Sequence, residues 1–252
     1  MAASPPETPR ALLTAWPERV GLPAQLLNGL PAIVGVFAME GHPAFGVAVL
    51  AALSGSQRSV ARMRAYEGAL TEALRDLGFR MDLTRVAPAN VDHTAEQVRL
   101  LQGTLTPPQI DQLGRLFEEL MRSTDAEWHD MLLRAVRAVV KDGVEEVTRH
   151  TILAQLSWLG PAPLRELQRL KDRPTRTRPD KRVREATPAQ VVLLTVGFIR
   201  EGGADAHEGP VNVAMVRVPA AESQLHGEYR LTSVGLAALR LFGPIDLSNT
   251  PG

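Results

Sequence analysis

Apolar residues recur every three or four positions along the first half of the chain, which is the spacing of one face of an α-helix. The longest such run predicts a helix from Pro43 to about Leu77, with Gly78 as its C-terminal cap. A loop is expected over residues 80–93, and a short helix over 94–102. The first half of the chain is therefore predicted to be helical.

Two more helices are predicted where capping residues stand directly before an apolar stripe. Thr106, followed by two prolines, is expected to begin one helix, and residues 123–127 supply capping candidates for the next. The two stripes are Ile110, Leu113, Leu116, Phe117 and Leu120, and then Trp128, Met131, Leu132, Ala135, Val136 and Val139. We therefore expect a flexible tail at residues 1–10 and a helical domain at 11–142.

The remainder of the chain is predicted to form a second domain of a different kind. Three helices are expected first. Two of them cover residues 144–159 and 161–170, where the apolar spacing is again helical. Thr187-Pro188 opens the third, which is expected to end at Gly202-Gly203.

Two strands and a final helix are predicted next. Residues 211–218 are rich in valine, and residues 228–231 are a second, shorter strand candidate, so the two are expected to pair as a β-hairpin. Thr232 is expected to cap a helix over Ser233 to Phe242. The predicted fold class is mainly α: a helical bundle, then a winged-helix-like α+β domain at residues 143–252.

This order of helices and strands resembles a winged helix-turn-helix. Residues Val196-Gly197-Phe198-Ile199 are similar to the turn where the third helix gives way to the wing. Residues Tyr229-Arg230-Leu231-Thr232-Ser233-Val234-Gly235 are similar to the exit from the last strand into a helix in bacterial winged-helix proteins. In winged-helix proteins that read DNA, the third helix enters the major groove, so the resemblance raises this possibility for the third helix here.

The predicted third helix has few groups that could read DNA. A reading helix presents Arg, Asn, Gln or Ser to base edges. Between Ala186 and Val196, only Gln190 and Thr195 could make such a hydrogen bond. The other residues are nearly all apolar, which indicates a helix covered by protein on more than one side, docked on the N-terminal bundle or on a partner. The docking surface is predicted to comprise Val191, Val192 and Leu194.

A strongly basic segment lies between the second and third predicted helices. Residues 171–184 contain seven basic residues, two acidic residues and two prolines, which predicts an extended loop. Three interpretations stay open: a solvated loop, salt-dependent contact with nucleic-acid phosphates, and contact with an acidic protein partner. No aromatic residue is interleaved to stack on bases. The basic residues are Lys171, Arg173, Arg176, Arg178, Lys181, Arg182 and Arg184.

Composition narrows the class of protein further. The formal net charge of +0 means that any attraction to nucleic acid must come from a local patch. The absence of cysteine excludes disulfides and thiolate metal sites, and a cytoplasmic location is the simplest expectation. Residues 26–53 are almost wholly apolar and long enough to cross a bilayer. Glu40, His42 and Pro43 in their middle favour two buried helices, with membrane contact as the alternative.

No combination of residues predicts catalysis, a metal or a cofactor. The six histidines include no pair at the helical i, i+4 spacing, and Asp205-Ala206-His207-Glu208 is interpreted as a loop tip. Glu118-Glu119 and Glu145-Glu146 are expected on solvent-facing helix stripes. The three tryptophans are expected in the core: Trp16, Trp128 and Trp158. We therefore predict a protein that is not an enzyme.

Residues Arg149-His150-Thr151-Ile152-Leu153-Ala154-Gln155-Leu156-Ser157-Trp158-Leu159, with the Leu231-Thr232 exit, resemble bacterial abortive-infection alpha-type helical proteins. The resemblance implies phage defence by halting the infected cell, and it carries over no catalytic residues. We therefore expect a non-catalytic interaction protein of a defence or stress system, which uses its winged helix to dock on a protein partner or on itself. The alternatives are a nucleic-acid-binding regulator that uses residues 171–184 and a membrane-acting effector that uses 26–53.

Overall fold

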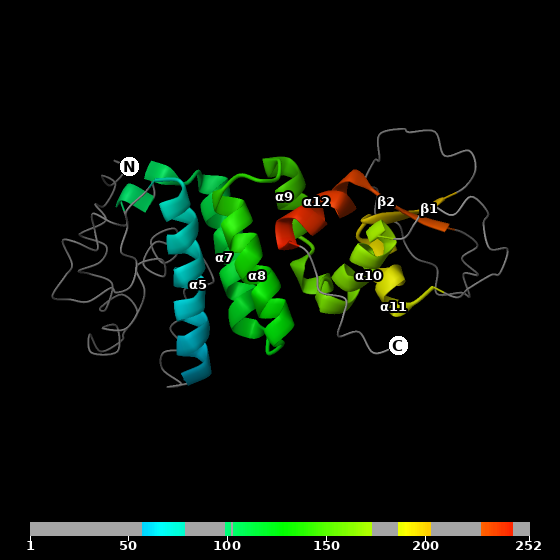
Figure 1. Cartoon of the computed structure of the whole chain (residues 1–252), viewed down its shortest axis with the longest axis horizontal. Coiled ribbons are helices and arrows are strands. Elements are labelled where there is room, and N and C mark those ends of the chain that lie inside the picture. Colours follow the sequence, from blue (N-terminus) through cyan, green and yellow to red (C-terminus); the bar gives the residue numbers. More distant parts are fainter. Residues whose placement is uncertain (1–56, 79–98, 102, 173–185, 203–227, 244–252) are drawn as a thin grey trace, which may run out of the picture. The chain divides into compact units, whose positions relative to one another are not determined.

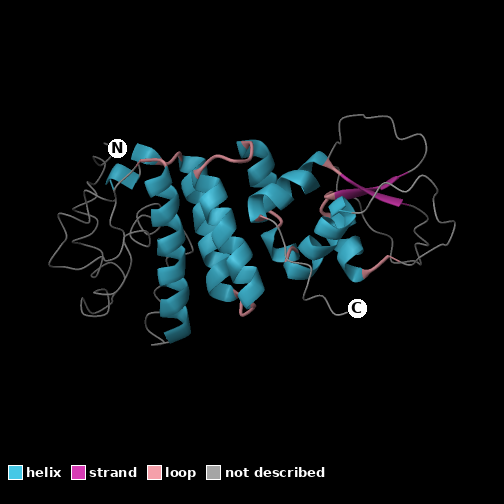
Figure 2. Cartoon of the chain, in the orientation of Figure 1, coloured by secondary structure: helices cyan, strands magenta, loops and turns pink. Residues whose placement is uncertain are grey.

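The structure is a computed structural model, and helices make up most of the part of the chain that it describes (Figures 1 and 2). The structure describes residues 57–78, 99–101, 103–172, 186–202 and 228–243. The chain divides into two compact units, residues 1–143 and 144–252. Each unit has its own set of buried apolar side chains.

Three long helices form most of the described part of the first unit. They are α5 (Gln57–Asp76), α7 (Pro107–Arg122) and α8 (Ala126–Val140). α8 packs against both α5 and α7, and α5 also contacts α7, so the three form a bundle (Figure 1). The apolar stripes predicted for α7 and α8 are buried throughout, which confirms both helices.

The starts of α7 and α8 follow from local capping chemistry. Thr106 begins α7 with a capping box: its hydroxyl accepts from the Gln109 N–H, and the Gln109 side chain accepts from the Thr106 N–H at 2.9 Å. The Asp125 carboxylate begins α8 by accepting from the backbone N–H groups of Glu127 and Trp128. Both predicted helix starts are therefore confirmed.

Two buried polar groups fix how these helices meet. The fully buried Tyr66 of α5 donates from its hydroxyl to the Leu113 carbonyl at 2.7 Å, and its ring meets Phe117 edge to face at a centroid distance of 5.1 Å. Burial raises the pKa of the Tyr66 hydroxyl, because the ionised form would lose its hydration. Gln109 donates from Nε2 to the Val139 carbonyl at 3.0 Å and so joins α7 to α8.

Two exposed ion pairs also join α5 to α8. Arg137 of α8 donates from Nε to Glu72 of α5 at 2.9 Å, and Lys141, which follows α8, pairs with Asp76. The hydrogen bond from Lys141 and its positive charge hold the pKa of Asp76 below its usual value. Because all four side chains are largely solvated, these pairs contribute little to stability.

α5 is the described part of the helix predicted to begin at Pro43. It ends at Asp76, and Gly78 follows with φ +87°, in the left-handed region that suits a helix cap. Leu77 belongs to the predicted apolar stripe but lies beyond the helix end, and its side chain is 47% exposed. Residues 43–56 lie outside the described residues.

The described part of the second unit combines short helices with a pair of strands. Its elements are α9 (Glu146–Leu153), the 3₁₀ turn η2 (Leu156–Trp158), α10 (Pro161–Asp172), α11 (Pro188–Thr195), β1 (Ile199–Gly202), β2 (Glu228–Leu231) and α12 (Ser233–Phe242). β1 and β2 pair antiparallel, with Ile199 opposite Leu231 (Figure 2). α12 contacts α9 and α10, and α10 contacts α11.

The prediction that the third helix reaches Gly202-Gly203 is wrong. α11 ends at Thr195, and Gly197, with φ +74°, turns the chain into β1. Periodicity does not mark this change, because a short apolar run is compatible with a helix or a strand, although the winged-helix resemblance suggests a turn at residues 196–199. β1 is the partner of β2, and the strand predicted at residues 211–218 lies outside the described residues.

The predicted helix over residues 144–159 is divided in two. α9 ends at Leu153, and the chain then makes the turn η2. Leu156 at the start of this turn and Leu159 after it are buried, and the side chain of Trp158 between them faces solvent. Trp158 is 63% exposed, and the prediction that it lies in the core is wrong. Trp128 is buried as predicted, and Trp16 lies outside the described residues.

Thr232 connects β2 to α12 and ties both to the start of β1. Its N–H donates to the Phe198 carbonyl at 3.0 Å, and its hydroxyl donates to the Gly197 carbonyl at 2.8 Å. The same hydroxyl accepts from the Gly235 N–H at 3.1 Å, which confirms the predicted cap. Gly235 is packed so closely that a Cβ there would lie 2.2 Å from the Phe198 carbonyl oxygen.

Candidate functional site

The candidate docking surface lies on α11, the third of the four described α-helices of the second unit. Thr187 begins α11 with a second capping box: its hydroxyl accepts from the Gln190 N–H at 3.3 Å, and the Gln190 side chain accepts from the Thr187 N–H at 3.0 Å. Pro188 occupies the first turn, where its missing N–H costs nothing. This local chemistry fixes where the helix starts and hence which side chains face outward.

The outward side of α11 is apolar and uncharged. Val191 is 42% exposed, while the other two predicted docking residues, Val192 and Leu194, are half-buried. Leu193 is fully buried and anchors the helix in the unit. We expected protein to cover this helix on more than one side. Among the described residues this is not seen, since Leu193 is the one buried residue of α11.

The two polar side chains of α11 that could read DNA are engaged within the unit. Gln190 donates from Nε2 to Oε1 of Glu166 at 2.8 Å, which ties α11 to α10. The Thr195 hydroxyl donates to the Val191 carbonyl of its own helix at 2.8 Å. To donate to a base edge, the Thr195 hydroxyl would have to give up its present acceptor, whereas the Gln190 amide uses one of its two N–H groups on Glu166. The helix as it stands offers an apolar surface in place of a set of hydrogen-bond donors.

The basic segment lies mostly outside the described residues. Lys171, at the end of α10, is exposed. The structure does not describe the six other predicted contact residues, which are Arg173, Arg176, Arg178, Lys181, Arg182 and Arg184.

Three of the four paired carboxylates have structural partners. Glu119 accepts from the Trp128 indole N–H at 3.1 Å, and Glu118 pairs with Arg122 one turn away on α7. Glu145 accepts from the Thr148 hydroxyl at 3.0 Å near the start of α9. Among the described residues, no three His, Asp or Glu side chains lie close enough together to hold a metal ion, and residues 205–208 are not among them.

No helix in the part of the chain that the structure describes is long and apolar enough to cross a membrane. Residues 26–53, for which membrane contact was the alternative interpretation, are outside that part. No protein family, curated protein or solved structure matches the chain. The resemblances to abortive-infection and winged-helix proteins therefore stay predictions.

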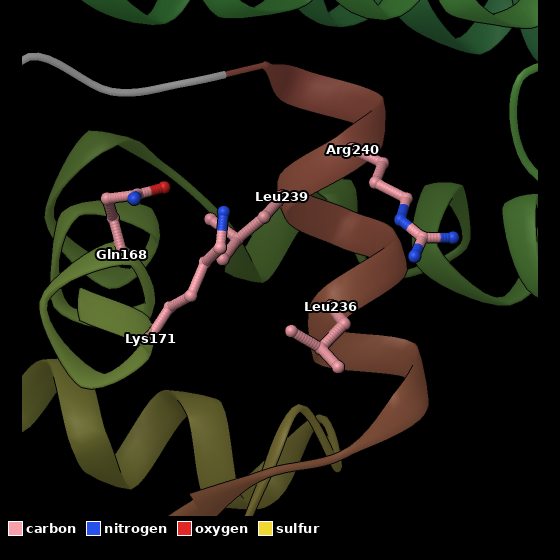
Figure 3. A pocket seen from close by; sticks show the side chains of 5 residues that line it. All are labelled: Gln168, Lys171, Leu236, Leu239 and Arg240. Carbon is pink, nitrogen blue, oxygen red and sulfur yellow. The ribbon is translucent and has the colours of Figure 1, made fainter. Parts of the chain in front are cut away.

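Sequence reasoning did not identify a cleft between α10 and α12 (Figure 3). Its lining residues are Gln168, Lys171, Leu236, Leu239 and Arg240. The two helices are far apart in the sequence, and only their packing brings these side chains together. An apolar residue on the solvent side of a predicted helix is the one signal that could have pointed to it, and Leu236 is such a residue.

Proposed function

We propose that the second unit is a winged-helix-like module that docks on protein, and that it associates through α11 with a second copy of the chain. The observation that carries the proposal is the exposed face of α11, which consists of Pro188, Val191 and Thr195 and has no charge. A helix that binds DNA relies on basic and polar groups to meet phosphates and base edges. A largely apolar face without charge suits contact with protein better.

The absence of charge favours a second copy as the partner. In a two-fold symmetric pair, a surface patch meets itself, so any charge near the axis lies close to the same charge of the other copy. α11 contains no charged residue, so two such faces can meet without this repulsion. α10, by contrast, carries five charges along its twelve residues: Arg165, Glu166, Arg169, Lys171 and Asp172.

The small size of this face sets the expected strength of association. α11 has only eight residues, and interfaces well below about 1,200 Å² are typically weak and transient. We therefore expect a reversible dimer with a Kd on the order of 10–100 μM, equivalent to roughly 6 kcal/mol.

Sedimentation velocity on the whole chain tests the proposal. The wild-type sedimentation coefficient should rise with protein concentration, and Val191→Asp should abolish the rise because two buried carboxylates would face each other. Val147→Asp is the matched control, since Val147 is an exposed valine on α9, and it should behave as the wild type. A wild-type chain that stays monomeric, or a Val191→Asp variant that still associates, would refute the proposal.

The nucleic-acid alternative makes a different prediction for the same protein. Fluorescence anisotropy with a labelled DNA duplex should show no tight, sequence-selective binding at physiological salt. If such binding occurs, and if it weakens and loses salt dependence when the arginines of residues 171–184 are replaced by alanine, the docking proposal is wrong.

A further inference from the structure

The cleft between α10 and α12 places an aliphatic surface between two positive charges (Figure 3). Leu236 and Leu239 line it from α12, and Leu236 is 41% exposed. Lys171 extends from α10 toward Leu239, and Arg240 follows Leu236 by one turn of α12. The guanidinium of Arg240 lies on the other side of α12 from Lys171 in this view (Figure 3). The two leucines therefore lie between the two cations.

Neither cation is neutralised within the described part of the chain. Lys171 and Arg240 form no ion pair with any residue that the structure describes. Asp172, the neighbour of Lys171 in the sequence, accepts instead from Nε2 of Gln168 at 2.6 Å. No acidic residue is among the described residues that line the cleft. The cleft therefore attracts negative charge, and its exposed leucine offers apolar area for contact.

We propose that this cleft binds an acidic segment of a partner protein, in which an aliphatic side chain stands between carboxylates. The aliphatic side chain packs on Leu236 and Leu239, and the carboxylates pair with Lys171 and Arg240. A groove between two helices is a surface on which amphipathic peptides commonly dock. The inference concerns a different surface from α11 and does not depend on association through that helix.

The size of the cleft favours one side chain of a protein over a whole small molecule. Its volume is about 260 Å³. Small-molecule sites typically have roughly 300–1,000 Å³. A protein segment needs only one anchor side chain in such a cleft, because contacts around the anchor supply the remaining area. Exposed ion pairs add more to specificity than to affinity, so the leucines set the strength of binding and the cations set the charge of the partner.

Selection from a phage-displayed library of random peptides on the whole chain tests the proposal. Leu236→Asp serves as the counter-selection, because it removes peptides that bind elsewhere, including those held by the basic residues of 171–184. The selected peptides should carry an aliphatic residue between acidic ones. A fluorescein-labelled selected peptide should bind Leu236→Asp about tenfold more weakly than the wild type in fluorescence anisotropy. Val147→Asp, at an exposed valine on α9, is the matched control and should bind as the wild type does, as should Val191→Asp.

Reversing the charge of the cleft separates recognition of carboxylates from simple apolar contact. The double variant with Lys171→Glu and Arg240→Glu should bind the acidic peptide about tenfold more weakly than the wild type. The same variant, used as the target of a new selection, should enrich peptides with lysine or arginine beside the aliphatic residue, because like charges disfavour the acidic ones.

Three results would overturn the proposal. The first is a selection on the wild type that yields no acidic and aliphatic sequence, and the second is a charge-reversed variant that still enriches acidic peptides. The third is association of the Val191→Asp chain that Leu236→Asp abolishes in sedimentation velocity, because that would identify a second copy as the occupant. Circular dichroism of each variant establishes that binding is measured on folded protein.

Discussion

Replacing Gly235 by alanine should destabilise the second unit, because the new Cβ has no room. It would lie 2.2 Å from the Phe198 carbonyl oxygen and 3.1 Å from the carbonyl carbon, and a backbone group cannot rotate away as a side chain can. Overpacking of this kind costs about 3 kcal/mol, and the better helix propensity of alanine returns about 1 kcal/mol. The expected net loss is about 2 kcal/mol, or about 8 °C in Tm for a unit of this size.

Gly68→Ala is the matched control for this substitution. Gly68 is an exposed glycine within α5, and a Cβ built there meets nothing within 4 Å. It should therefore stabilise its helix by about 0.5–1 kcal/mol. Differential scanning calorimetry of both variants and of the wild type measures the two effects. If Gly235→Ala is as stable as the wild type, the close contact with Phe198 does not determine the residue at this position.

Three smaller perturbations test the first unit. Tyr66→Phe should cost about 1–2 kcal/mol in urea denaturation, because the buried Leu113 carbonyl loses its donor; an unchanged midpoint would contradict this. Thr106→Ala should cost about 1 kcal/mol through loss of the cap of α7, and Thr106→Ser should recover most of it. Lys141→Ala should raise the pKa of Asp76, measured by carboxyl NMR titration. The pKa of Asp76 is lower in the folded chain than in the unfolded chain. The ion pair therefore stabilises the fold at pH values above the pKa of Asp76 in the unfolded chain, and this stabilisation is lost as the pH falls through its pKa in the folded chain.

Helix starts were predictable because their causes are local. Thr106, Thr187 and Thr232 each stand where a side-chain oxygen can accept from an N–H three residues later, and two of them precede proline. The end of α11 was not predictable in this way. Residues 191–199 are apolar apart from Thr195 and Gly197, and it is the pairing with β2, distant in sequence, that makes Ile199 the first residue of a strand.

The candidate site was predictable only in part. The apolar character of α11 follows from its composition, but the engagement of Gln190 by Glu166 depends on how α10 and α11 pack. Burial of Trp158 was expected from residue type, and the turn η2 reverses it. The cleft depends on the packing of α10 against α12, and the exposed Leu236 is its one local signal in the sequence.

The pairing of β1 with β2 has a consequence for how this unit can vary during evolution. The strands are joined through residues 203–227, yet the entropy of closing a connection grows only with the logarithm of its length. A connection one quarter as long would change the closure free energy by only about 1 kcal/mol. The hydrogen bonds of Thr232 to Gly197 and Phe198 hold the two strand ends together independently of that length. Insertions and deletions between the strands therefore cost little stability. Related chains should differ in length there before they differ in sequence at the Thr232 contact.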